Sequence, residues 1–148
     1  MKRKILIFIV TYQSSFRLMT IIKKIKKIKR KKDLYRILIS DDNSTDDTIN
    51  YIKKIKKFEK VNIILNKKNI GYGANIKQCL FYAIKRKFDY AIMIHGDDQY
   101  DAKYIPKIVN KLRDKNIYMV TGSRMVNKND ALKGGMPLYK FVGNTILT

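Results

Sequence analysis

Short apolar runs alternate along the chain with longer segments in which lysine and isoleucine are mixed. The runs lie at residues 4–11, 35–40, 61–66, 90–94 and 118–121. Continuous apolar runs of this length are typical of strands in a parallel sheet that is covered on both faces. We therefore expect five strands, and we expect the run at 90–94 to be buried on both of its faces.

The first segment between the runs shows helical periodicity. Over residues 16–31, apolar side chains recur three and four positions apart with lysines opposite, namely Leu18, Ile21, Ile22, Ile25 and Ile28. This pattern predicts a helix that packs on the sheet through its apolar stripe while its lysines face solvent. The same basic, amphipathic pattern could lie on an anionic membrane, an alternative that we favour less.

Further helices are expected around the apolar stripe of Ile49, Ile52 and Ile55 and at residues 74–87 and 104–115. Strands and helices then alternate from one end of the chain to the other. Such an order predicts a mostly parallel sheet with helices on both faces. We expect one three-layer α/β/α domain over residues 1–148.

Polar oxygen groups gather where two of the predicted strands end. Asp41 and Asp42 follow the second strand, and the fourth strand runs into His95-Gly96-Asp97-Asp98-Gln99. Open α/β sheets bind their ligands at this carboxyl edge. Adjacent carboxylates repel each other, and a divalent cation such as Mg2+ or Mn2+ relieves that repulsion. A solvated acidic turn is the alternative for Asp97 and Asp98.

Two other polar segments precede predicted helices. Ser44 or Thr45 can cap the second helix, and Asp46 and Asp47 favour the positive end of its dipole, so helix capping explains these residues. Gly71 and Gly73, in the segment 69–75, allow the backbone to approach a phosphate at a helix N-terminus. The two glycines could equally form a tight turn.

The amino-acid composition limits the kinds of binding partner that are expected, but it does not determine the fold. The 148 residues include 33 Lys and Arg against 12 Asp and Glu, a formal net charge of +21. This surplus attracts nucleic acid, an anionic membrane or nucleotide phosphates, unless it reflects a compositional bias alone. The single cysteine, Cys79, excludes an internal disulfide and falls on a predicted apolar helix face. No stretch approaches the roughly 18 apolar residues of a membrane span, and we expect a cytoplasmic protein.

Six motifs occur in the order seen in one family of transferases. They are IVTYQ at 9–13, DDNSTDDT at 41–48, NIGYGAN at 69–75, HGDDQY at 95–100, GSR at 122–124 and GGMPLYKFVGN at 134–144. The chain resembles the family 2 glycosyltransferases, which have the nucleotide-diphospho-sugar transferase (glycosyltransferase A-type) fold. It is most similar to the branch that loads sugars onto polyprenyl phosphates, such as dolichyl phosphate.

The resemblance implies a set of site residues. A nucleotide-diphospho-sugar, UDP- or GDP-linked, is expected to contact Thr11, Tyr12, Asp41, Asp42, Gly71, Gly73, Asp97 and Arg124. Mg2+ or Mn2+ is expected to bind in the segment that contains Asp97, Asp98 and Gln99. In one register His95 replaces a family carboxylate, and Asp97 and Gln99 remain as oxygen ligands. In the other register Asp97 contacts the ribose and Asp98 holds the metal. The sequence leaves both registers open.

The family resemblance also implies that a part of the domain lies beyond residue 148. Family domains continue past this point, so the acceptor side is expected to be incomplete, and we assign no general base. An acceptor that is already a phosphate anion needs none.

The favoured function is transfer of a sugar from a nucleotide donor to a polyprenyl phosphate or a cell-surface glycan precursor. With this function we expect peripheral contact with the inner face of an anionic membrane. We expect no nucleic-acid partner, and an oligomer is possible. The alternatives are a truncated domain that binds nucleotide sugar without turnover and, with less support, a basic nucleic-acid-binding protein.

Overall fold

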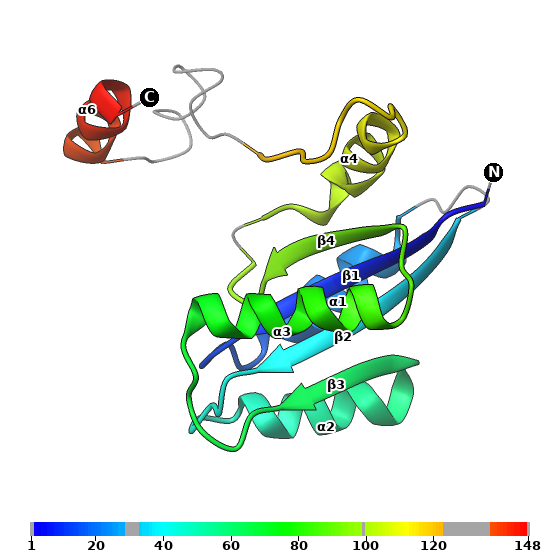
Figure 1. Cartoon of the computed structure of the whole chain (residues 1–148). Coiled ribbons are helices and arrows are strands. Elements are labelled where there is room, and N and C mark those ends of the chain that lie inside the picture. Colours follow the sequence, from blue (N-terminus) through cyan, green and yellow to red (C-terminus); the bar gives the residue numbers. More distant parts are fainter. Residues whose placement is uncertain (1, 29–32, 99, 123–136, 148) are drawn as a thin grey trace. The chain divides into compact units, whose positions relative to one another are not determined.

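The computed structural model describes residues 2–28, 33–98, 100–122 and 137–147, and divides the chain into two compact units. The unit Met1–Asp114 contains all strands that the structure describes (Figure 1). Its elements are β1 (Lys4–Thr11), α1 (Arg17–Lys26), β2 (Leu34–Asp41), α2 (Thr48–Phe58), β3 (Val61–Leu65), α3 (Tyr72–Lys85), β4 (Tyr90–His95), the 3-10 turn η1 (Ala102–Tyr104) and α4 (Ile105–Leu112). The unit Lys115–Thr148 contains helix α6 (Leu138–Leu147).

The sheet is parallel, with strand order β3-β2-β1-β4. In the register of the central strand, Ile9 lies between Ile39 of β2 and Ile94 of β4. Because the carboxyl ends of parallel strands share one edge, the loops after β1, β2 and β4 converge there.

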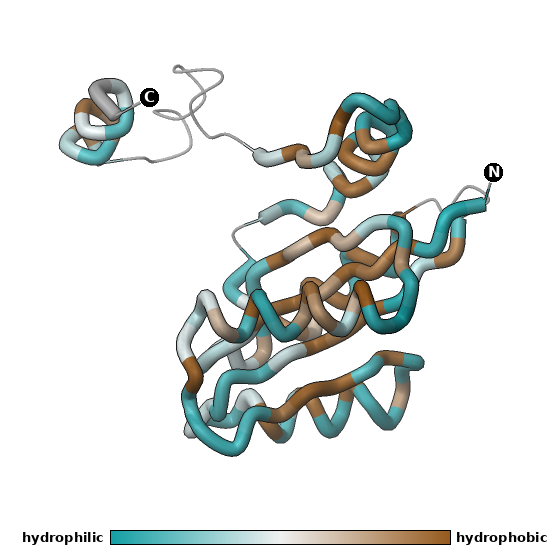
Figure 2. Tube along the Cα trace, in the orientation of Figure 1, coloured by the Kyte–Doolittle hydropathy of each residue, from teal (hydrophilic) through white to brown (hydrophobic). Residues whose placement is uncertain are grey.

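Alternate residues of β1 enter two separate hydrophobic cores. Ile5, Ile7 and Ile9 pack in the core that receives the buried residues of α1, α2 and α4. On the other face, Leu6, Phe8 and Val10 pack in the core that contains Cys79 and Ala83 of α3. This period of two follows from strand geometry, and it confirms the α/β architecture with helices on both faces of the sheet. The apolar residues accordingly concentrate along the strands in Figure 2.

β4 departs from the sequence prediction. Ile92 and Ile94 are buried, but Met93 is 38% exposed on the opposite face. In the described sheet β4 is an edge strand, and the interior strands β1 and β2 are the ones with residues in the cores on both faces. An apolar run shows that a strand is buried, but it does not specify the strand order.

Two other predicted elements differ from the structure. The helix expected over residues 16–31 ends at Lys26, where Ile28 N–H closes the last turn by donating to Ile25 O, and residues 29–32 lie outside the described part. The strand expected at 118–121 is not formed: Tyr118 is 92% and Met119 78% exposed, and no described strand pairs with them. A strand needs a neighbouring ladder to bury its apolar side chains.

The start of α2 is held by a different residue from those expected. Neither Ser44 nor Thr45 caps the helix; instead Asp46 accepts hydrogen bonds from Thr48 N (3.0 Å) and Ser15 Oγ (2.6 Å). Although burial acts to raise it, these hydrogen bonds hold the pKa of the Asp46 carboxyl below its ordinary value. The contacts fasten the loop after β1 to the first turn of α2.

Within the described ranges, every helix falls short of the length and apolar content that crossing a bilayer requires. The single domain expected over residues 1–148 stays a prediction.

Candidate functional site

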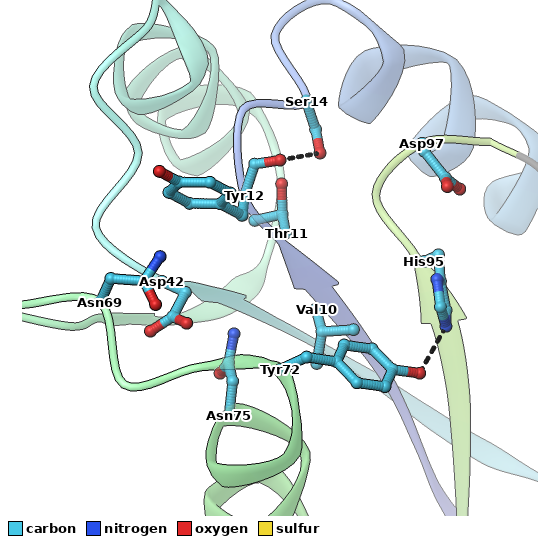
Figure 3. A pocket seen from close by; sticks show the side chains of 10 residues that line it. All are labelled: Val10, Thr11, Tyr12, Ser14, Asp42, Asn69, Tyr72, Asn75, His95 and Asp97. Carbon is cyan, nitrogen blue, oxygen red and sulfur yellow. Dashed lines mark hydrogen bonds between the residues drawn. The ribbon is translucent and has the colours of Figure 1, made fainter.

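A cavity of about 210 Å³ opens at the carboxyl edge of the sheet, between the ends of β1 and β4 and the start of α3 (Figure 3). Its lining residues are Val10, Thr11, Tyr12, Ser14, Asp42, Asn69, Tyr72, Asn75, His95 and Asp97. The structure therefore brings together four of the residues that the sequence predicted, namely Thr11, Tyr12, Asp42 and Asp97. The others that line the cavity were not among the predicted site residues.

The end of β1 packs closely against the turn after β4. Gly96 N–H donates to Val10 O (2.9 Å), and a Cβ at Gly96 would lie 2.7 Å from Thr11 Oγ1 and from Ser14 Oγ. Only a residue without a side chain fits this position. Thr11 is 3% exposed, and its Oγ1 is buried without a hydrogen-bond partner in the described residues. A buried hydroxyl without a hydrogen-bond partner on a cavity wall is suited to contact a ligand.

Asp41 and Asp42, although adjacent, have different surroundings. Asp41 is fully buried and does not line the cavity; it accepts from Ser44 N (2.8 Å) and Ser44 Oγ (2.5 Å). Ser44 Oγ in turn accepts from Gln13 N (2.9 Å). Asp41 therefore links the loops after β1 and β2 through Ser44.

Asp42 holds in place the part of the cavity wall that is formed by the loop before α3. Its Oδ1 accepts from Asn66 Nδ2 and Ile70 N (both 2.9 Å), and its Oδ2 accepts from Gly71 N (2.8 Å). Gly71 has φ of +86°, a left-handed conformation that glycine adopts without strain. These bonds tie the loop before α3 to the end of β2, and the loop places Asn69 on the cavity wall. Neither Gly71 nor Gly73 lines the cavity itself.

An aromatic cluster closes the side next to β4. The Tyr72 hydroxyl and His95 Nε2 are hydrogen-bonded at 2.8 Å, and the rings of His95 and Tyr100 lie 4.8 Å apart, centre to centre (Figure 3 shows the first pair). Burial raises the pKa of the Tyr72 hydroxyl, and Tyr100 and Asp97 raise it further. Tyr72 is therefore neutral at physiological pH. The helix-start position of Tyr72 gave no sequence signal for this contact.

The two carboxylates after β4 also differ. Asp97 lines the cavity, whereas Asp98 does not and forms an ion pair with Lys24 of α1 (2.7 Å). Gln99 and Arg124, two further predicted site residues, lie outside the described residues. In the described part of the chain, no group of three or more His, Cys, Asp or Glu side chains is arranged to hold a metal ion.

Comparison with known proteins identifies relatives of this chain. The family model described as Glycosyl transferase family 2 matches residues 6–143. An uncharacterized protein of Methanocaldococcus jannaschii is 32% identical over 120 residues, which cover 76% of this chain and 49% of that protein. The low-salt glycan biosynthesis hexosyltransferase Agl6 of Haloferax volcanii is 32% identical over 117 residues, which cover 78% of this chain and 26% of that protein. The chain thus spans less than half the length of these relatives.

Solved structures share the fold. The mannosyltransferase PcManGT from Pyrobaculum calidifontis, in complex with GDP-Man and Mn2+, superposes with a TM-score of 0.72 at 13% identity, over 88% of this chain and 39% of that one. TarS from S. aureus, in complex with UDP-GlcNAc, gives a TM-score of 0.61 at 14% identity, over 84% of this chain and 38% of that one. The predicted glycosyltransferase A-type fold is confirmed.

Proposed function

The chain belongs to glycosyl transferase family 2, and we propose that its cavity binds a nucleoside diphosphate sugar whose sugar is then transferred to an acceptor. The observation that carries this proposal is that Thr11, Tyr12, Asp42 and Asp97 line one cavity at the carboxyl edge of the sheet. Ligands of open α/β sheets bind at this edge. The hexosyltransferase activity of the Haloferax relative, and the nucleotide sugars bound by PcManGT and TarS, support the same assignment.

The wall between Tyr12 and Asp42 suits the nucleoside. The Tyr12 side chain is 49% exposed, which leaves its ring available to stack on a base. Asp42 already accepts three hydrogen bonds from the loop before α3, whereas a carboxylate offers about four acceptor positions. We propose that its remaining position accepts from a base N–H or a ribose hydroxyl. Because the loop already holds the Asp42 carboxylate in place, binding the nucleoside would cost little conformational entropy at this residue.

The glycines before α3 act on the nucleotide indirectly in this proposal. Gly71 N–H already donates to Asp42 Oδ2 and to Asn69 Oδ1 (2.9 Å), so it is not available to a phosphate. Its left-handed backbone lets the loop reach Asp42. Gly73 and Arg124 remain predicted contacts of the diphosphate.

The residues present fit a divalent cation that is shared with the donor. Asp97 offers a carboxylate at the cavity, and the unpartnered Thr11 Oγ1 is a second oxygen on its wall. Mg2+ is commonly held by one or two carboxylates together with substrate phosphates, so an all-protein cluster is not required. When bound, Mg2+ or Mn2+ would neutralise the charge that develops on the nucleoside diphosphate leaving group. Asp97 and Thr11 Oγ1 are therefore the protein ligands that we propose, and Gln99 stays a predicted ligand.

The acceptor that we propose is a polyprenyl phosphate, because its phosphate oxygen needs no general base to become a nucleophile. A domain that binds nucleotide sugar without turnover is the second candidate. Transfer of labelled sugar to polyprenyl phosphate distinguishes the two. Cytoplasmic location and oligomerisation stay predictions.

Contact with an anionic membrane belongs to the same proposal. Lys27, just after the C-terminal end of α1, and Lys53 and Lys57 of α2 are exposed, and both helices cover the same face of the sheet. Lysines on such a face are attracted to anionic lipid, by about 1 kcal/mol each at the surface. We expect co-sedimentation with vesicles that contain anionic phospholipid, not with neutral ones, and its loss in high salt. Equal binding to both vesicle types would refute the contact.

Isothermal titration calorimetry tests the donor site. UDP, GDP and their sugars are titrated into the protein in the presence of Mn2+ or EDTA. We expect the nucleotides of one of the two bases to bind in Mn2+ and to bind much more weakly in EDTA, because Asp97 and the diphosphate would hold the cation together. If no nucleotide binds under either condition, the proposed function is wrong.

A further inference from the structure

The turn after β4 is connected to a helix outside the cavity. Lys24 Nζ of α1 lies 2.7 Å from Asp98 Oδ2, and the side chains of Lys24 and Asp98 are 41% and 21% exposed. Asp97, the preceding residue, lines the cavity, whereas neither Lys24 nor Asp98 does. The ion pair therefore joins α1 to the turn that carries the cavity carboxylate.

Asp98 has a conformation that needs support from its surroundings. Its φ is +61°, in the left-handed region that most residues with a Cβ seldom adopt, although Asp adopts it more often than others. Its Oδ1 is buried and has no hydrogen-bond partner in the described residues. A residue keeps such a conformation when neighbouring groups fix it, and strained residues of this kind occur at functional sites. Here the Lys24 ammonium supplies a cation to the carboxylate and holds the turn in place.

The helix that carries Lys24, α1, is packed tightly in the core. Its apolar stripe of Leu18, Ile21, Ile22 and Ile25 is at most 2% exposed. Lys24 also differs from Lys23 on the same helix, because Lys23 is exposed to solvent whereas Lys24 is half-buried. The contact with Asp98 is thus distinct from the solvated lysines that make the chain basic.

We propose that Lys24 is a positioning residue for the donor site: through Asp98 it holds the turn of residues 96–98 so that Asp97 faces the cavity. This inference rests on the proposed function, since it concerns how Asp97 is presented to the nucleotide and its cation. Asp98 acts as the support and not as a metal ligand, because Lys24 already provides its counter-charge. Replacing a residue that orients a metal ligand without touching the metal typically lowers the metal affinity by about 10- to 100-fold.

Three single variants test the proposal by calorimetry with Mn2+ and the nucleoside diphosphate that the wild type binds. Lys24→Met removes the ammonium and keeps the aliphatic stem, and we expect affinity to fall about 10-fold. Lys24→Arg keeps the charge and should restore most of the affinity. Lys23→Met is the matched control on the same helix and should bind as the wild type does. If Lys24→Met and Lys23→Met bind equally well, the proposal is overturned.

Exchanging the charges of Lys24 and Asp98 distinguishes a supporting role of Asp98 from a role as a metal ligand. In the double variant Lys24→Asp/Asp98→Lys, an ion pair can re-form, but residue 98 can no longer bind a cation. We expect tighter Mn2+-dependent binding than in Lys24→Met, with thermal unfolding used to verify that each variant is folded. Binding that is weaker than in Lys24→Met would show that Asp98 itself is a ligand, which contradicts the proposal.

Hydrogen exchange provides a measurement that does not depend on nucleotide. The amides of residues 95–98, including Gly96 N–H bonded to Val10 O at 2.9 Å, should exchange faster in Lys24→Met than in Lys23→Met. If the wild type binds no nucleotide, the proposed function fails, and the exchange rates still decide the role of Lys24. Unchanged exchange in Lys24→Met overturns it.

Discussion

Asp97→Ala is expected to abolish metal-dependent binding of the nucleoside diphosphate while leaving the protein folded. Asp97 supplies a carboxylate to the cavity wall, and we assign it to the cation that the donor diphosphate shares. Removing one partner of a close charge pair costs about 2–5 kcal/mol, so affinity in Mn2+ should fall by about 30-fold or more. Calorimetry with wild type and variant, in Mn2+ and in EDTA, measures this effect.

The matched control for Asp97→Ala is Asp47→Ala. Asp47 is an exposed carboxylate in the loop after β2, where its Oδ1 accepts from Asn50 Nδ2 (2.7 Å), and it does not line the cavity. Both variants remove one negative charge from the same end of the domain. Only Asp97→Ala should lose the difference between Mn2+ and EDTA. Equal losses in the two variants would mean that the cation responds to the overall charge and not to Asp97.

Much of the fold could be predicted from the sequence because apolar periodicity reports which positions are buried. The first strand was predicted with its observed bounds, and Ile5, Ile7 and Ile9 enter one core while Leu6 and Phe8 enter the other. Strand order is not encoded in this periodicity. The edge position of β4 among the described strands, with Met93 exposed, therefore had to come from the structure.

The candidate site could be predicted in part for a similar reason. Thr11, Asp42 and Asp97 come at or just after strand ends, and parallel strands bring such residues to one edge. Successive side chains at a strand end tend to point to opposite faces, and Asp41 and Asp42 are separated in this way. The family resemblance had assigned the second residue of the pair, Asp42, to the nucleotide, but no sequence pattern indicated that Asp41 bonds to Ser44 instead. Tyr72 and His95 meet only because α3 packs beside β4, a long-range contact without a local pattern.

Gly96→Ala is expected to destabilise the protein and to impair the donor site. An added Cβ would lie 2.7 Å from Thr11 Oγ1 and Ser14 Oγ and 2.8 Å from Thr11 Cβ. Thr11 Cβ is attached directly to the backbone of β1 and cannot rotate away, so the end of β1 and the turn after β4 must separate. Overpacking of this kind typically costs about 1–3 kcal/mol. Thermal and denaturant unfolding measure the loss, and calorimetry measures the accompanying fall in nucleotide affinity.

Two other glycines separate this steric effect from the general effect of adding a methyl group. At Gly73 no atom lies within 4 Å of the added Cβ and the backbone is helical, so Gly73→Ala should be neutral or stabilising by about 0.4–1 kcal/mol. At Gly71 there is space, but φ of +86° should make Gly71→Ala cost about 1–2 kcal/mol. If Gly96→Ala proves as stable as Gly73→Ala, the close packing of the strand ends does not hold in solution. The cavity would then have to form with the nucleotide instead of before it.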